Sequence, residues 1–206
     1  MISLPKRPLL LVVSAPSGAG KTTLCDRLRA EFDSIVYSVS CTTRAPRDGE
    51  EDGTDYHFIT RDVFEKKIIA GEFLEHATVH NNLYGTLRAE VLAGFAGGKH
   101  VLMDIDVQGA KQIRNAVANA RPDDPLRCGF VDVFIAPPSL DALQKRLIAR
   151  GKDSATVIEN RVRHAAAELK HWNEYRFAIV NDRLDTSYDA LRAIFIAEQH
   201  EVQRTI

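Results

Sequence analysis

The feature that most constrains the fold of this chain is a segment near its start, where an apolar run meets a turn of small residues. Residues 9–13 (LLLVV) are all apolar, and residues 14–23 read SAPSGAGKTT. Leu24, Leu28 and Phe32 then recur at spacings of four, which is typical of one face of a helix. The order buried strand, glycine-containing turn and helix is the setting that a phosphate-binding loop requires.

The chemistry of this turn suits a nucleoside triphosphate. Successive backbone N–H groups, together with the positive end of the following helix, form an anion site. We expect Lys21 to reach the β- and γ-phosphates and the Thr22 hydroxyl to ligate Mg²⁺. Ala15 stands where the first glycine is usual, and its methyl group fits if the backbone keeps a negative φ. An ordinary strand–turn–helix with a surface lysine is the alternative interpretation.

Length and composition bound the class of protein. A chain of 206 residues suits one α/β domain with inserted lobes. A net charge of −1 gives no electrostatic case for general nucleic-acid binding. The three cysteines show no metal-type spacing and are expected to be reduced, and the short apolar run near the start suits neither a signal peptide nor a membrane span. We therefore expect a cytoplasmic protein that binds neither nucleic acid nor membrane.

Strand-like apolar runs alternate with helical patterns along the chain, which favours a parallel sheet with helices on both faces. The expected later strands of this α/β core are residues 34–39, 100–106, 130–135 and 177–180. The expected strand 100–106 ends in Asp104 and Asp106, where phosphate-loop enzymes carry the acid that orders Mg²⁺ and its waters. A strand capped by an aspartate at the next turn is the alternative.

Two parts of the chain interrupt this alternation. Residues 40–95 begin with a polar, turn-rich stretch, and we expect them to form an inserted lobe in which residues 83–86 lead into a helix. Further on, Ser139 is expected to cap a helix whose inner face includes Leu147 and Ile148, followed by a polar hinge at residues 152–156 and a second helix.

Arginines flank this hinge. Arg146 and Arg150 lie before it, and Arg161 and Arg163 lie after it. Charged helix faces are usually solvated, but beside a nucleotide site arginines around a hinge suit a lid that closes over phosphates. A phosphate loop, an acidic strand end and such a lid together favour a kinase of small acceptors. A regulatory GTPase is disfavoured because the chain has no Asn-Lys-x-Asp stretch.

Several motifs in fixed order resemble the guanylate kinase family, bacterial type, from residue 9 to about residue 195. They are SxTTRxPRxGE at residues 40–50, DYxF at 55–58, EFxE at 72–75, YGT at 84–86, DIDxQG at 104–109, RLxxRG at 146–151 and VND at 180–182. The resemblance implies a phosphate-loop NTPase core at residues 1–39, 96–138 and 173–206. It also implies a GMP-binding lobe at residues 40–95 and a helical lid at residues 139–172.

The resemblance also implies roles for the residues of the lobe. Two guanidinium groups and two phenols suit the dianionic GMP phosphate, and these come from Arg44, Arg47, Tyr56 and Tyr84. The guanine base would be read by Ser40, Glu75, Thr86 and Asp106. Glu75 would accept from guanine N1–H and the 2-amino group, a donor pair that adenine lacks.

On the donor side the resemblance implies an ATP site made of the phosphate loop and two later residues. These are Ala15, Pro16, Ser17, Gly18, Ala19, Gly20, Lys21, Thr22, Thr23, Arg146 and Asn181. The expected catalytic residues are Lys21, Arg150, Arg161 and Asp104, and the expected Mg²⁺ site is Thr22 with Asp104 acting through water.

The implied reaction is the Mg²⁺-dependent phosphorylation of GMP, and of dGMP, by ATP, with ATP and GMP as the small-molecule partners of a monomer or homodimer. One alternative is a relative that phosphorylates a ribose bisphosphate, but the guanine-reading positions Ser40, Glu75 and Thr86 are all present. Another is a guanylate-kinase-like module that binds proteins, which would have little need for the intact Gly20-Lys21-Thr22.

Overall fold

The computed structural model describes residues 7–79, 81–151 and 153–201, and its centre is a five-stranded sheet of order β2-β7-β1-β8-β9. Every pairing in this sheet is parallel. Its strands are β1 (Leu10–Ser14), β2 (Ile35–Tyr37), β7 (His100–Asp104), β8 (Phe130–Ala136) and β9 (Phe177–Val180). The findings confirm the expected α/β fold with a parallel sheet flanked by helices.

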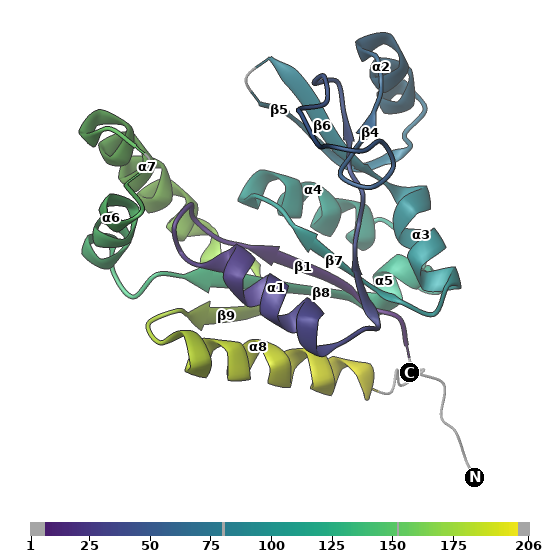
Figure 1. Cartoon of the computed structure of the whole chain (residues 1–206). Helices are drawn as coiled ribbons and strands as arrows, with labels where there is room; N and C mark the ends of the chain where they lie inside the picture. The colour runs from purple at the N-terminus through teal and green to yellow at the C-terminus, as the bar shows by residue number, and fades with distance from the viewer. Residues whose placement is uncertain (1–6, 80, 152, 202–206) are drawn as a thin grey trace.

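Both faces of this sheet are covered, which explains why β1 is apolar at every position. Leu11 and Val13 pack in one cluster with residues of α1 (Lys21–Glu31) and α8 (Leu184–Gln199). Leu10 and Val12 pack in a second cluster with Ile113 of α4 (Val107–Ala118) on the opposite face. In Figure 1, α1 and α8 lie on one side of the sheet and α4 on the other.

A second, four-stranded sheet of order β4-β3-β6-β5 lies within residues 41–87. Its strands are β3 (Cys41–Thr42), β4 (His57–Phe58), β5 (Phe73–Val79) and β6 (Asn82–Leu87), with α2 (Arg61–Ile69) beside them. Cys41, Phe64 and Leu83 form its small core. Residues 83–86 lead into a helix, as expected: they pair antiparallel with β5 as part of β6, and helix α3 (Arg88–Ala96) follows directly.

Helices α6 (Leu140–Ala149) and α7 (Ala155–Glu168) form the other outlying part and continue into a 3₁₀ helix, η1 (Leu169–Glu174). Ser139 caps α6 by accepting from the Ala142 N–H at 3.0 Å, as expected. The inner face of α6 carries Leu143 and Leu147, whereas Ile148 is 57% exposed and does not belong to it. Figure 1 shows this helical pair and the small sheet at opposite upper corners of the molecule.

The carboxyl end of β7 differs from expectation in a way that matters for the site. The strand ends at Asp104, and Asp106 is the N-cap of α4, where its Oδ1 accepts from the Gly109 N–H at 2.8 Å. The two carboxylates therefore belong to different elements. A short helix, α5 (Pro125–Gly129), precedes β8. Within the described residues, no helix is both long and apolar enough to cross a membrane.

Candidate active site

The loop between β1 and α1 depends on two glycines in conformations that side chains rarely adopt. Gly18 and Gly20 have φ values of 94° and 95°. A Cβ atom on Gly20 would lie 2.4 Å from Asn181 Nδ2, which itself donates to the Ala19 carbonyl at 2.7 Å. Among the described residues, Asn81 alone combines a side chain with a positive φ, so Ala15 keeps the negative φ that its methyl group needs.

Lys21 and Thr22, at the start of α1, converge on the carboxyl end of β7. Lys21 Nζ forms an ion pair with the Asp104 carboxylate and donates to the Ile105 carbonyl at 2.8 Å. The Thr22 hydroxyl donates to Asp104 Oδ2 at 3.3 Å. Because β1 and β7 are neighbours, with Val13 opposite Asp104, strand pairing alone brings the loop and this acid together.

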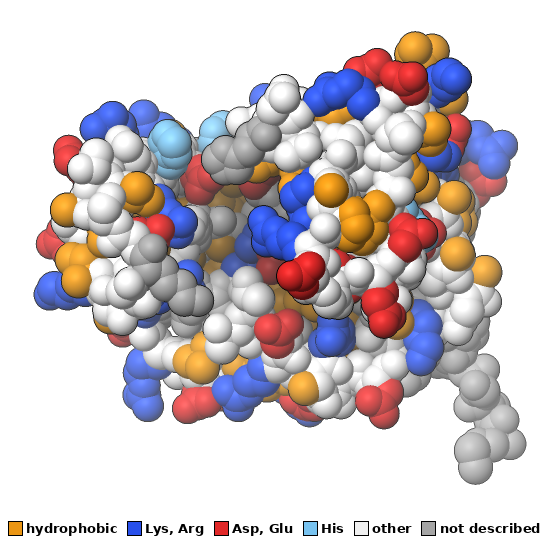
Figure 2. All heavy atoms as spheres, turned by 45° about the horizontal axis from the view of Figure 1, so that its top comes forward, with side chains coloured by type: hydrophobic (Ala, Val, Ile, Leu, Met, Phe, Trp, Pro, Cys, Tyr) orange, Lys and Arg blue, Asp and Glu red, His pale blue; other side chains and the backbone are white. Residues whose placement is uncertain are grey.

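A polar hollow of about 370 Å³ opens over this loop; we call it the phosphate hollow. Its walls are residues of the loop together with Asp104, Asp106, Arg150 and Glu168. Figure 2 shows the hollowed middle of this face, with Lys and Arg side chains at its edge. The partly buried carboxyl of Glu168 has a pKa raised by desolvation and by the nearby charge of Asp106.

The helical pair α6–α7 brings its arginines to the loop. Arg161 donates to the Ser17 hydroxyl at 3.4 Å and pairs with Asp153 at 3.2 Å. Arg146 donates to the Asn181 carbonyl at 2.8 Å. Arg150 lies on the wall of the phosphate hollow, so three of the four arginines around the expected hinge lie near the loop. The fourth, Arg163, pairs with Glu159 at 3.8 Å on the exposed surface of α7.

A second hollow of about 440 Å³ adjoins the outer side of the loop; we call it the outer hollow. Arg146 and Asn181, both expected here, line it together with Gly20. Leu184 and Ala149 add apolar wall that the sequence reasoning did not assign to the site. Such a mixture of apolar surface and a few polar groups suits a flat, partly polar ligand such as a base.

The small sheet gathers three of the four groups expected to hold the acceptor phosphate. The Arg44 guanidinium lies 5.5 Å from the centre of the Tyr56 ring, and the rings of Tyr56 and Tyr84 are 6.0 Å apart. Both terminal nitrogens of Arg44 donate to Glu50 at 2.9 Å. The Arg47 side chain is exposed, and its backbone N–H joins the cluster by donating to Glu50 at 2.7 Å.

Three of the four expected guanine-reading residues also lie together. The hydroxyls of Ser40 and Thr86 are 3.1 Å apart, and Glu75 lies opposite Thr86 in the β5–β6 pairing. Glu75 is 7% exposed. Its pKa is raised by desolvation and by the charge of Asp106, and it is lowered in part by hydrogen bonds from Thr86.

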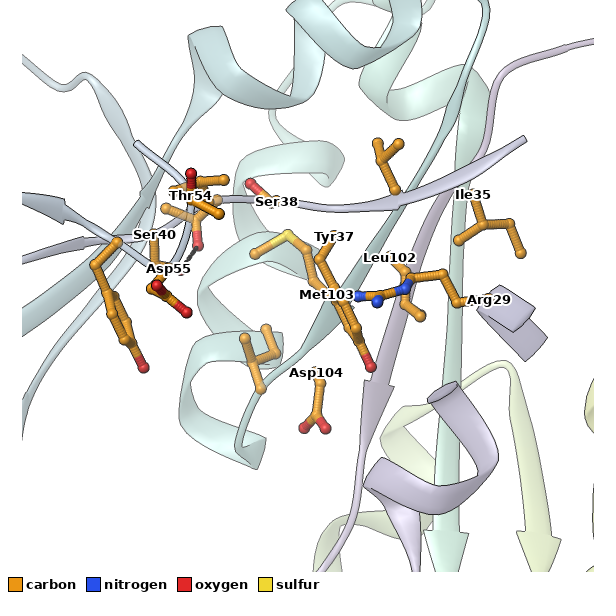
Figure 3. A pocket seen from close by; sticks show the side chains of 15 residues that line it. Arg29, Ile35, Tyr37, Ser38, Ser40, Thr54, Asp55, Leu102, Met103 and Asp104 are labelled. Atoms are coloured by element: carbon orange, nitrogen blue, oxygen red, sulfur yellow. Dashed lines mark hydrogen bonds between the residues drawn. The ribbon is translucent and has the colours of Figure 1, made fainter. Parts of the chain in front are cut away.

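A third hollow of about 550 Å³, the lobe hollow, lies between the small sheet and the core sheet. Figure 3 shows Ser40 and Asp55 on one side of it, Tyr37 and Leu102 nearer the core, and Asp104 at its edge. Tyr56 and Thr86 are also on its walls. Asp104 therefore borders both the phosphate hollow and the lobe hollow.

Sequence reasoning missed several residues of the site for identifiable reasons. Glu50 lies within one of the ordered motifs, but a carboxylate beside an anion site is expected to repel the anion. Its contribution becomes evident only from its ion pair with Arg44. Glu168 lies on the wall of the phosphate hollow, and Asp153 holds Arg161, only because the α6–α7 pair folds back toward the loop. No local pattern marks either residue.

The structure combines a glycine-dependent phosphate loop, an acid at the neighbouring strand end, arginines of α6–α7 near the loop and a hollow beside a second sheet. Together these features are typical of a phosphate-loop phosphotransferase that acts on a small acceptor. Comparison with known proteins gives the family. The family model described as guanylate kinase matches residues 7–198. The chain belongs to the guanylate kinase family, and it is an enzyme of the kinase class.

Individual relatives support this assignment over nearly the full length. The chain is 45% identical to a guanylate kinase of Alkalilimnicola ehrlichii, with 95% of this chain and 91% of the relative covered. It is 47% identical to a guanylate kinase of Maricaulis maris, with 94% and 85% covered. A crystal structure of guanylate kinase from Anaplasma phagocytophilum matches with a TM-score of 0.70 and 33% identity, covering 97% of this chain and 90% of that one.

Proposed function

We propose that this enzyme transfers the γ-phosphoryl group of ATP directly to a phosphate oxygen of GMP, and also of dGMP, and that the residues below perform the transfer. ATP-dependent phosphorylation of GMP to GDP is the activity of its family. The observation that carries the assignment of residues is the position of Asp104, which borders both the phosphate hollow and the lobe hollow. A donor in one and an acceptor in the other would meet at this residue.

We assign the ATP phosphates to the loop of residues 15–23. Its backbone N–H groups and the start of α1 supply an anion site, and Lys21 lies at its base within the phosphate hollow. In the absence of phosphate, Lys21 pairs with Asp104. The γ-phosphate would be a stronger ion-pair partner for Lys21, because it carries more negative charge than one carboxylate. The adenine would occupy the outer hollow beside Arg146, Asn181 and Leu184.

We assign the GMP phosphate to Arg44, Arg47, Tyr56 and Tyr84. The guanidinium of Arg44 and the two tyrosine rings already lie together, which lowers the entropic cost of assembling donors around a dianion. Glu50 holds Arg44 through two hydrogen bonds, and its pKa is lowered by them. It therefore stays ionised and keeps the guanidinium oriented.

We assign the guanine base to Glu75, Ser40 and Thr86, with Asp106 close to Glu75. An ionised carboxylate has two acceptor oxygens for N1–H and the 2-amino group, whereas adenine presents an acceptor at the first position and no amino group at the second. AMP would leave the buried Glu75 carboxylate without these partners. Because an unpaired buried carboxylate costs free energy, the site would favour GMP over AMP.

The donor set at the loop fits Mg²⁺. The Thr22 hydroxyl and the Asp104 carboxylate are oxygen ligands of the kind that Mg²⁺ prefers, and they lie 3.3 Å apart at the mouth of the loop. When bound, Mg²⁺ neutralises charge on the phosphates. Thr22 would hold the ion directly and Asp104 would hold it through water.

The reaction needs no nucleophile from the protein, because a phosphate oxygen of GMP is already anionic at neutral pH. One bond forms between that oxygen and the γ-phosphorus while the bond to the bridging oxygen of ADP breaks in line with it. Arg150 and Arg161 would neutralise the charge on the transferring group, and α6–α7 would exclude water from it. Residues 40–95 thus serve as the GMP lobe, residues 139–172 as the lid and the remainder as the core.

A coupled assay of ADP release tests the proposed function. ADP should be released rapidly with GMP, more slowly with dGMP and at background rates with AMP, UMP, CMP or ribose 1,5-bisphosphate. Faster turnover with ribose 1,5-bisphosphate than with GMP would show that the acceptor is a ribose bisphosphate. Background release of ADP with every acceptor would indicate a binding module. Lys21→Met should abolish turnover with GMP and leave the fold intact.

A further inference from the structure

The first turns of α4 support the strand that carries Glu75. Gln112 makes two hydrogen bonds to the backbone of His76: its Nε2 donates to the His76 carbonyl at 2.9 Å, and its Oε1 accepts from the His76 N–H at 3.0 Å. The side-chain amide thus pairs with β5 as a neighbouring strand would. Since His76 directly follows Glu75, this pairing fixes the backbone next to the carboxylate.

Gly109 lies one turn earlier on the same face of α4. A Cβ atom there would lie 3.2 Å from Glu75 Oε2 and 3.5 Å from Asp106 Oδ1. The missing side chain therefore leaves room for the Glu75 carboxylate beside the helix. Gly109 provides the space for the Glu75 carboxylate, and Gln112 holds β5 at the distance from α4 at which the carboxylate fills that space.

The partner strand β6 does not hold this part of β5 regularly. The register of the β5–β6 pairing shifts between Phe73 and Glu75, so the ladder is irregular where the carboxylate must be directed. Irregular pairing of this kind bends a strand and leaves its direction to other contacts. The two hydrogen bonds from Gln112 lie immediately after this irregularity, where they can supply that direction.

We propose that Gln112 is a positioning residue for guanine recognition, which sets Glu75 by pairing with the backbone of His76, and that Gly109 is required so that the carboxylate fits beside α4. This inference rests on the proposed function, because it takes Glu75 as the group that reads guanine. Gln112 makes both of these hydrogen bonds to β5, whereas the phosphate loop lies between β1 and α1. Its loss should therefore alter the use of GMP and leave the use of ATP unchanged.

Gln112→Met tests the proposal, because methionine keeps the length and bulk of the side chain but can form neither hydrogen bond. Lys111→Met is the matched control, since Lys111 is exposed on the same helix. The KM for GMP, the KM for ATP and kcat are measured for both variants, for Glu75→Gln and for the double variant Gln112→Met/Glu75→Gln.

We expect Gln112→Met to raise the KM for GMP roughly tenfold, because small misplacements of a recognition group are costly. The KM for ATP should stay within about twofold, as should every constant of Lys111→Met. The double variant should be little worse than Glu75→Gln alone, since both changes act on one contact. Gly109→Ala should give the same split between the two KM values, and it decides the question if Gln112→Met does not fold.

Several outcomes overturn the proposal, and they separate it from the proposed function. If Glu75→Gln weakens GMP but Gln112→Met behaves like Lys111→Met, the positioning role is wrong and the guanine assignment stands. Equal rises in both KM values, or additive effects in the double variant, also exclude a role through Glu75. If Glu75→Gln leaves the KM for GMP unchanged, both the guanine assignment and this inference fail.

Discussion

At the scale of single residues, Glu75 combines a costly environment with a specific task. Burial raises the pKa of its carboxyl, and the charge of Asp106 raises it further. Burying the charged form costs free energy, but only the charged carboxylate offers two acceptor oxygens to guanine. Under the proposed function, the protonation state of Glu75 would therefore couple pH to the choice of acceptor.

As the pH is lowered, the KM for GMP should therefore begin to rise at a higher pH than the ordinary pKa of a glutamate would predict. Lowering the pH through the raised pKa protonates Glu75 and turns one acceptor oxygen into a donor, so the KM for GMP should rise at least about tenfold. The KM for ATP should not follow it. Measurement of both constants between pH 4.5 and pH 8, a range set by the roughly neutral working pH and ordinary glutamate values, checks this.

Glu75→Gln is the control for this pH dependence, since its amide does not titrate. The variant should bind GMP weakly, and its KM for GMP should stay constant over the same pH range. An equally steep acid rise in the variant would assign the titration to another group.

At the scale of elements, the phosphate loop works because two glycines adopt backbone conformations closed to other residues. Gly20→Ala introduces both strain at a φ of 95° and a Cβ atom 2.4 Å from Asn181 Nδ2. Asn181 would have to move from the Ala19 carbonyl, which distorts the loop and the outer hollow together. We expect the KM for ATP to rise at least about tenfold, by analogy with other small displacements of binding groups.

Gly98→Ala separates strain from collision in this experiment. Gly98 has a φ of 70° and open space around its would-be Cβ atom. This control should lower the free energy of unfolding by about 1 kcal/mol through strain alone and leave both KM values unchanged. A normal KM for ATP in Gly20→Ala would show that the loop tolerates the side chain.

The elements themselves differ in how far the sequence predicts them. The strand, loop and helix around Lys21 follow from local signals, as does the cap Ser139, whose side chain accepts from the first turn of its helix. These signals act within a few residues, so they can be identified without the tertiary structure.

Elements that depend on distant partners cannot be identified from a local stretch of sequence alone. Residues 83–86 form a strand because β5 and β3 lie on either side of them, and a sequence window around Gly85 contains neither strand. A Cβ atom on Gly85 would lie 2.8 Å from the Glu75 carbonyl, so a glycine is needed here for close pairing of the two strands. The exposure of Ile148 likewise depends on where α7 packs against α6.

The site residues show the same division. Residues of the loop and the ordered motifs could be named from the sequence, because fixed spacing carries them. Gln112 and Asp153 could not, because a helix-to-strand pairing and a contact within the folded α6–α7 pair give each its place.

At the scale of the whole molecule, buried ionic contacts tie the layers together behind the site. Asp132 of β8 is 2% exposed, pairs with Arg114 of α4 at 3.1 Å and accepts from the Arg176 N–H at 2.9 Å. It thereby links the central sheet to α4 and to the start of β9. Since α4 also supports Glu75, this contact stabilises the scaffold of the acceptor site.

Asp132→Ala should therefore destabilise the protein strongly. The change leaves the Arg176 N–H without its acceptor and removes one of the two carboxylates that pair with Arg114, which keeps Glu174 at 2.7 Å. We expect a loss of about 2–3 kcal/mol, and at about 2–4 °C per kcal/mol for a domain of this size, Tm should fall by at least about 5 °C. Urea and thermal unfolding measure both quantities.

Asp123→Ala is the matched control, because Asp123 pairs with Arg121 on the surface, where both side chains are largely exposed. Its free energy of unfolding should change by less than about 0.5 kcal/mol. Similar losses in the two variants would contradict a structural role for the buried pair.

Under the proposed function, the loop holds the donor and the small sheet selects guanine through Glu75. The ratio of kcat/KM for GMP to that for AMP, measured for the unaltered enzyme and for Glu75→Gln, tests it most directly. We expect a ratio of at least about 10³ in the unaltered enzyme, because hydrogen-bonding sites reject unpaired analogues strongly, and a fall of at least about tenfold in the variant. A ratio near unity in the unaltered enzyme, or the same ratio in both proteins, would contradict the account.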